Sequence, residues 1–310
     1  MLFEDEPTFE AYNEFNKYVK ELVGGPRSST MKEESAQAIR QYLRQNATEP
    51  EGDLFGKVVP MVIKDGKSGQ ESRKRDADGE IIRQAESFGH DEGLKRLCNC
   101  QFVKKVLPRR VETAGKKLGL TDPKPDWVFG IREPEFPDRK LPEPGRNARA
   151  LIGVAPGLQY PWFAIENKGC ACPMAEAENQ AIRDGATLVS AQRQLAILAG
   201  WIDEKTEAVG VDQDNIAFSC TWVPDLAHIF VHWFERKELG AEGDCVYHMN
   251  KIRSYLMNDN SHVSDFRKDS HNVLEYGITL ARKEKLRKLY HDIAARNTTS
   301  TSSGTSSAGS

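Results

Sequence analysis

The sequence predicts a mixed α/β domain in which helical segments surround a β-sheet, and three observations support this class. Short apolar runs rich in β-branched and aromatic residues recur between residues 124 and 234, as is typical of buried strands. In other stretches apolar residues return every three or four positions, which is the period of an amphipathic helix. Hydrophobic residues make up 39% of the 310 residues, enough for one sizeable core. We therefore expect one large domain with additional segments at both ends of the chain.

Residues 1–80 are predicted to form a helical extension that ends in a flexible loop. A first helix is indicated by apolar residues at helical spacing, namely Phe9, Tyr12, Phe15, Val19 and Leu22, and Gly24-Gly25-Pro26 ends it. Thr30-Met31-Lys32-Glu33 is a capping box that opens a second helix. Residues 46–80 are rich in glycine and charge, and only Val58–Ile63 is predicted to be ordered, as a short strand or extended segment.

Residues 81–296 are predicted to form the main domain. The expected elements are helical Glu80–Lys105, strands at Lys124–Ile131 and Pro161–Lys168, helix Met174–Leu198, strands Asn215–Val223 and Ala227–Phe234, and helix Phe266–Arg296. Residues 132–158 hold many prolines and glycines and are predicted to be an irregular loop, while Gly185 is a candidate break in its helix. Cys245–Tyr255 fits a strand or a helix, and residues 297–310 form a Ser/Thr-rich tail predicted to be disordered.

Charged residues lie at the ends of the first two predicted strands, where a buried charge requires an oppositely charged or hydrogen-bonding partner. Asp126 precedes an apolar run, and Glu166 and Lys168 end the next one. Because Glu166 and Lys168 are two positions apart, they project from the same face of a strand. If the two strands pair, the two carboxylates and the ammonium converge, which is chemistry for a divalent cation and a phosphate. The alternative is structural: Asp126 caps a turn, and Glu166 and Lys168 form an ordinary ion pair.

The spacing Pro125-Asp126 followed by Glu166-Asn167-Lys168 resembles the PD-(D/E)XK nuclease superfamily. Over roughly residues 85–295 the resemblance is closer to one group of it, the PD-(D/E)XK nuclease-like domain of uncharacterised proteins from filamentous fungi. The segments that carry this likeness are Pro125–Gly130, Ala177–Gln180, Gly185–Val189, Val231–Trp233 and Asn272–Gly277. The resemblance implies a restriction-endonuclease-like αβββαβ core, to which this chain adds an N-terminal helical segment and a long C-terminal helix.

The resemblance also implies roles for the residues of the motif. Asp126 and Glu166 would hold Mg²⁺ or Mn²⁺, since these cations prefer oxygen ligands, with the backbone carbonyl of Asn167 as a third ligand. Lys168 would position or activate the attacking water.

Members of the superfamily often add a glutamate from the first core helix and a glutamine from the helix after the lysine. Glu86 is our candidate for the first, in preference to Glu92. Gln180 is our candidate for the second, in preference to Gln194.

The expected activity is therefore metal-dependent hydrolysis of phosphodiester bonds in DNA, by an endo- or exonuclease that can act as a homodimer. The formal net charge of −3 argues against a strongly basic nucleic-acid footprint. Two basic clusters, within residues 104–117 and 282–288, fit either solvated helix faces or a phosphate-tracking surface. A catalytically silent module that binds nucleic acid or protein on the same fold is the alternative, and an interaction protein without a site is a third.

The remaining sequence features indicate where in the cell the protein is located and argue against other metal or binding sites. No apolar run of about 18 residues occurs, and the acidic N-terminus lacks a signal peptide, so we expect an intracellular protein, cytoplasmic or nuclear. Two Cys-x-Cys pairs, Cys98/Cys100 and Cys170/Cys172, could hold a metal, although free thiols fit this spacing better. We assign His228 and His232 to the sheet, and the strand aromatics Trp127, Phe129, Trp162 and Phe163 to the core rather than to base stacking.

Overall fold

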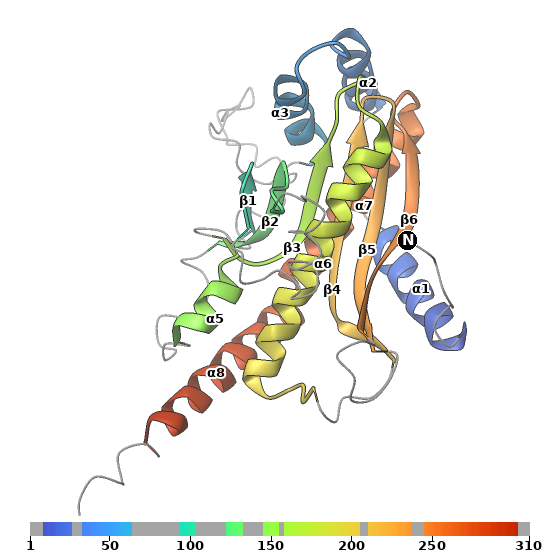
Figure 1. Cartoon of the computed structure of the whole chain (residues 1–310). Coiled ribbons are helices and arrows are strands. Elements are labelled where there is room, and N and C mark those ends of the chain that lie inside the picture. Colours follow the sequence, from blue (N-terminus) through green and yellow to red (C-terminus); the bar gives the residue numbers. More distant parts are fainter. Residues whose placement is uncertain are drawn as a thin grey trace, which may run out of the picture.

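The computed structural model shows a mixed α/β fold with one six-stranded sheet and helices on both faces and at both ends (Figure 1). The structure describes residues 9–26, 33–63, 94–102, 122–132, 145–154, 158–204, 210–236 and 245–302. The predicted α/β class is therefore confirmed.

The strands lie in the sheet in chain order, from β1 to β6. Their bounds are β1 Leu94–Cys98, β2 Trp127–Arg132, β3 Leu158–Asn167, β4 Gly210–Val223, β5 Leu226–Arg236 and β6 Cys245–Leu256. All neighbouring pairs are antiparallel except β3 and β4, which are parallel. A parallel pair needs a long crossover, and helix α6 (Met174–Ala199) supplies it.

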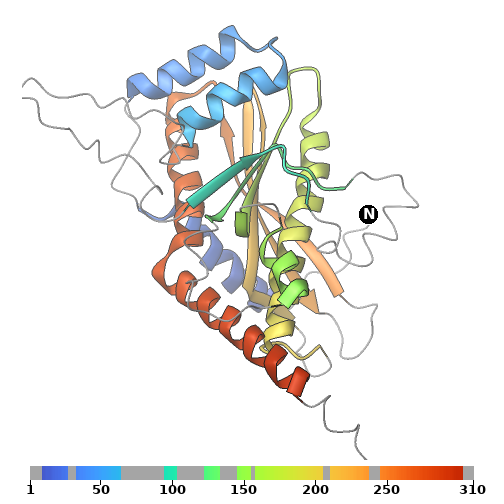
Figure 2. The same ribbon diagram turned by 90° about the vertical axis from the view of Figure 1, so that its left-hand side faces the viewer.

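Opposite faces of the sheet are covered by different helices (Figures 1 and 2). Helix α6 lies across one face, mainly over β3 and β4. Helices α1 (Phe9–Gly24) and α7 (Asn260–Ile278) pack on the other face, and α2 (Glu33–Gln45) and α3 (Glu51–Val62) lie at one end. Among the described helices, none is both long and apolar enough to cross a membrane.

The core extends over both faces of the central strands, because each face is covered by helices, and the face under α6 also holds buried polar side chains. Trp222 on β4 contacts Phe266 of α7 and Phe55 of α3, with ring centroids 5.0 and 5.4 Å apart. Trp233 on β5 contacts Phe15 of α1 at 5.1 Å. The described part of the N-terminal segment therefore shares one core with the sheet. The four strand aromatics Trp127, Phe129, Trp162 and Phe163 are buried, as we predicted.

Helix α6 runs unbroken through Gly185, so the predicted break there is wrong. The glycine is required by packing instead, because a Cβ at this position would overlap the ring of His232 on β5. The helix ends at Gly200, whose φ of 74° is the left-handed conformation that terminates many helices.

The prediction of a strand at Val58–Ile63 is wrong, because these residues belong to α3 and its C-cap. Leu54, Phe55, Val58, Val59 and Val62 are buried, at helical spacing on one side of α3. Gly52, Gly56 and Pro60 hid this period, since all three residues weaken a helix signal. Pro60 is tolerated near the last turn, and the helix gains its stability from packing rather than from propensity.

Two further expectations are corrected at the other edge of the sheet. Within the predicted helical segment Glu80–Lys105, residues Leu94–Cys98 form strand β1, which pairs with β2. Its five residues are too few for periodicity to separate strand from helix. Residues 80–93 and 103–105, and the basic cluster at 104–117, lie outside the described residues. Within the predicted loop 132–158, Gly145–Ile152 form helix α5.

The predicted long C-terminal helix is two helices, α7 and α8 (Leu280–Ser302), separated at Thr279. Trp162 stands close to Gly277, where any side chain would overlap its ring. Helix α8 reaches Ser302, so the prediction of disorder from residue 297 is wrong up to that residue. Residues 303–310 lie outside the described part of the chain.

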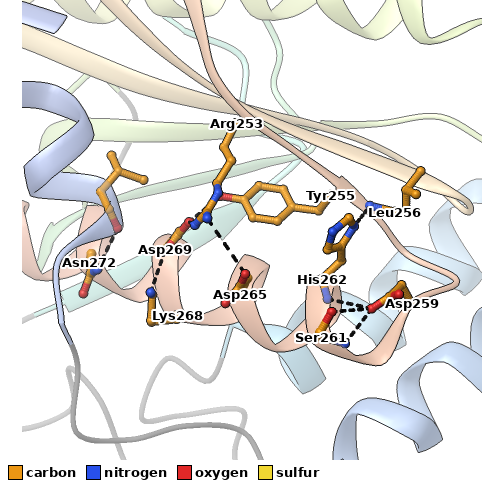
Figure 3. Close-up of polar contacts among 11 residues, drawn as sticks. Arg253, Tyr255, Leu256, Asp259, Ser261, His262, Asp265, Lys268, Asp269 and Asn272 are labelled. Atoms are coloured by element: carbon orange, nitrogen blue, oxygen red, sulfur yellow. Dashed lines mark hydrogen bonds and ion pairs between the residues drawn. The ribbon is translucent and has the colours of Figure 1, made fainter. Parts of the chain in front are cut away.

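Polar contacts fasten α7 to the edge strand β6 (Figure 3). The carboxylate of Asp259 caps the helix by accepting from the backbone N–H groups of Ser261 and His262. Near the middle of α7, Asp269 is fully buried and accepts from Arg253 and from the hydroxyl of Tyr255, both at 2.7 Å. The segment predicted as either strand or helix, Cys245–Tyr255, is this edge strand.

Candidate active site

The start of β2 and the end of β3 lie side by side, which brings the two halves of the sequence motif together. The strands are antiparallel, with Trp127 opposite Ile165. Oδ2 of Asp126 accepts a 2.7 Å hydrogen bond from the backbone N–H of Asn167. Glu166 and Asn167 are buried in the ladder between β3 and β4, opposite Thr221 and Trp222. The predicted pairing of the strands is therefore present.

The carboxyl group of Glu166 meets a second buried acid, Asp184 on α6. Their side chains are hydrogen-bonded to each other, and the residues are only 3% and 1% exposed. Burial raises the pKa of both groups, and the negative charge of Asp184 raises the pKa of Glu166 further. Two carboxylates in contact in a site of low polarity retain one proton between them at neutral pH.

Lys168 is nearly buried and contacts an acid from a distant part of the chain. Its Nζ lies 3.8 Å from Oε1 of Glu51, the first residue of α3. The other oxygen of Glu51 accepts from the backbone N–H of Gly169 at 3.3 Å. Burial raises the pKa of Glu51, and the nearby charge of Lys168 opposes that rise. Helix α3 is thus fastened to the loop that follows β3.

Asp126 is part of the same electrostatic group. Burial raises its pKa, while the hydrogen bond from Asn167 and the charges of Lys168 and Lys124 lower it. Asp126 in turn raises the pKa of Glu51, Glu166 and Asp184. Four carboxyl groups therefore act on one another around Lys168, an excess of negative charge that favours a cation.

The structure brings together Asp126, Glu166, Asn167 and Lys168, as the sequence motif predicted, without testing their roles. Gln180 lies on α6 one turn before Asp184, and its Oε1 is buried without a hydrogen-bond partner among the described residues. Glu86 and Glu92 lie outside the described residues, so the structure does not test either of them as the glutamate from the first core helix.

The structure adds Glu51 and Asp184, which sequence reasoning missed. Glu51 lies more than a hundred residues before Lys168, in a segment whose helix was not recognised. Asp184 interrupts the apolar face of α6 between Ala181 and Leu188, which are both buried. An acid on the buried face of a helix is the one signal that could have identified it.

The side chains offer few ready-made metal ligands. In the part of the chain that the structure describes, no three His, Cys, Asp or Glu residues are grouped so that they could hold one metal ion. This applies to both Cys-x-Cys pairs, all four members of which are described. The donors near Glu166 are oxygens, and Oδ2 of Asp184 has no hydrogen-bond partner among the described residues. Mg²⁺ is commonly held by one or two carboxylates and completed by water and phosphate, so this set fits it.

Comparison with known proteins gives one match. Residues 39–289 match the family described as Domain of unknown function (DUF7924), which covers more than half of the chain. Neither the curated proteins nor the solved structures contain a match to this sequence.

Proposed function

Because the chain belongs to the DUF7924 family, whose function is unknown, we propose an activity from the geometry of the site: metal-dependent hydrolysis of phosphodiester bonds, with DNA as the substrate. The observation that carries the proposal is the meeting of Asp126, Glu166 and Lys168 where β2 begins and β3 ends. Two acids and an amine at one point are suited to hold a cation beside a phosphate.

The connectivity of the sheet supports the proposal. β1, β2 and β3 form an antiparallel meander, and α6 then crosses over to β4, parallel to β3. This order agrees with the strand–strand–strand–helix–strand part of the restriction-endonuclease-like core. Helix α3, which precedes these strands and contributes Glu51, is our candidate for its first helix.

Asp126 and Glu166 are the residues that would hold Mg²⁺ or Mn²⁺, with the backbone carbonyl of Asn167 as a further oxygen ligand. When bound, the cation would lower the pKa of a water molecule and neutralise charge on the phosphate. The unpartnered Oδ2 of Asp184 and the excess of carboxylates are the features that fit a cation here.

The protein's own groups would orient the reactants. Lys168 would hold the attacking water or a phosphate oxygen through its ammonium group, and Glu51 would fix the position of that ammonium from α3. The hydrogen bond from Asn167 would keep Asp126 directed towards the end of β3. Gln180, with its unpartnered oxygen, would orient water on the α6 side.

A catalytically silent binding module on the same fold is the second candidate, and one observation favours it. Two charged groups of the site already have contacts within the chain: Glu166 is hydrogen-bonded to Asp184, and Lys168 is paired with Glu51. These internal contacts hold both side chains without a cation. A module of this kind would bind nucleic acid without metal and with a strong dependence on salt.

The decisive experiment is calorimetric titration of the protein with Mn²⁺ and Mg²⁺, followed by incubation of labelled single-stranded and double-stranded DNA with each cation. We expect binding by the parent protein, and loss of both binding and cleavage in Glu166→Gln and Asp126→Asn. Glu235→Gln is the matched control, because Glu235 is a buried acid on the same sheet that is bound to His248 instead. DNA binding in EDTA together with absence of cleavage would replace the nuclease proposal by the binding module.

A further inference from the structure

A row of polar side chains continues from Glu166 across the sheet beneath α6. Glu166 on β3 is paired with Thr221 on β4, which is paired with His228 on β5. Directly paired residues share a face of the sheet. Glu166 contacts Asp184 and His228 contacts Glu178, and both of these partners belong to α6. Thr221 therefore lies between a carboxyl group and an imidazole on the face that α6 covers.

The hydroxyl of Thr221 does nothing for stability in this arrangement. The residue is fully buried, and its Oγ1 has no hydrogen-bond partner among the residues that the structure describes. An unsatisfied buried hydroxyl costs about 1–3 kcal/mol, and valine would fill the same space without that cost. A hydroxyl at this position therefore points to a ligand.

The next side chain of the row, His228, does not satisfy this hydroxyl. Its Nδ1 lies 3.0 Å from Oε1 of Glu178, and Nζ of Lys251 lies 3.6 Å from the same oxygen. His228 is therefore held by Glu178, while Oγ1 of Thr221 is left without a partner among the described residues.

We propose that Thr221 is a further oxygen ligand of the cation at Glu166; this rests on the cation site proposed above. Thr221 is the direct neighbour of Glu166 on β4, and its Oγ1 has no hydrogen-bond partner among the described residues, so both of its lone pairs are available to a cation beside Glu166. A neutral oxygen donor suits Mg²⁺ or Mn²⁺.

The test measures Mn²⁺ affinity by calorimetry in Thr221→Val and Thr221→Ser. Loss of an outer-shell partner already weakens metal binding about 10-fold to 100-fold, so we expect the valine variant to bind at least about 10-fold more weakly. The serine variant keeps the hydroxyl and should bind within about 3-fold of the parent. Without metal, Thr221→Val should unfold at a temperature no lower than the parent. A valine variant that binds Mn²⁺ as tightly as the parent would overturn the proposal.

Ser219→Ala is the matched control. Ser219 on β4 and His232 on β5 are a buried hydroxyl–imidazole pair joined by a 2.7 Å hydrogen bond, so this hydroxyl, unlike that of Thr221, has a partner. Removal of that hydroxyl leaves a buried imidazole nitrogen without a partner, so stability should fall while Mn²⁺ affinity stays unchanged. The expected pattern is the reverse of that for Thr221→Val.

The cation site and the ligand role of Thr221 can fail separately. If the parent protein binds no Mn²⁺, the cation site itself fails and the ligand role of Thr221 fails with it. If the parent binds and only the valine result is negative, the cation site stands without Thr221.

Discussion

Replacement of Asp184 by asparagine should change how the stability of this protein depends on pH. In the folded state Glu166 and Asp184 retain a proton that both groups lose in the unfolded chain, where their pKa values are near 4.5 and 3.8. Because the folded-state pKa values are raised, the folded protein binds more protons above pH 5. The contribution of this pair to stability therefore falls as pH rises above about 5.

The size of the effect follows from the retained proton. One proton held only by the folded state lowers the free energy of unfolding by about 1.4 kcal/mol for each pH unit, or about 3 kcal/mol between pH 5.5 and 7.5. Asp184→Asn removes one acid and leaves an amide that can donate to Glu166. The slope should then flatten by about 1.4 kcal/mol per pH unit, so that the variant becomes relatively more stable as pH rises.

Urea unfolding at pH 5.5, 6.5 and 7.5 in EDTA measures this slope. Asp259→Asn is the control, because hydrogen bonds from the first turn of α7 lower the pKa of that exposed acid. Its contribution is lost only as pH falls towards that low pKa, so its effect should be constant over the range tested. Equal slopes in the parent protein and in Asp184→Asn would refute the shared proton.

Three further predictions concern packing, and each is measured by urea or thermal unfolding. Gly185→Ala should destabilise by about 1–3 kcal/mol through overlap with His232, and an unchanged midpoint would contradict the close approach. Asp269→Asn should cost about 2–3 kcal/mol, because it weakens the bonds to a guanidinium and a phenol; a smaller loss would mean that α7 is held by apolar contacts alone. Phe15→Ala should cost about 3–5 kcal/mol by removing the contact with Trp233; if α1 does not belong to the core, the loss will be below about 1 kcal/mol.

The central strands and α6 were predictable because their signals are local and strong. β3, β4 and β5 each contain a buried stretch rich in aromatic and β-branched residues, and Pro224-Asp225 marks the turn of the β4–β5 hairpin. The edge strands were harder. The polar residues of β6 fit a strand or a helix, and β1 has only five residues. In both segments, pairing with a neighbouring strand decides that the residues form a strand.

Helix α3 shows why one site residue could not be found from the pattern. Its glycines and proline weaken the helical period, and its stability comes from contacts such as Phe55 against Trp222. Without the helix there was no reason to connect Glu51 with Lys168. The same argument applies to Asp184, whose meaning depends on its contact with Glu166 across the interface between α6 and β3.

The sequence by itself determined the class of fold, the main strands and the motif residues Asp126, Glu166 and Lys168. These features are local, because the hydrophobic periods of strands and helices and the spacing of a short motif involve only residues close together in the chain. Only the tertiary structure decided which distant groups meet these residues, namely Glu51, Asp184 and Thr221. Their contacts depend on strand register and helix docking. These are set by burial summed over the whole core, and no single segment encodes them.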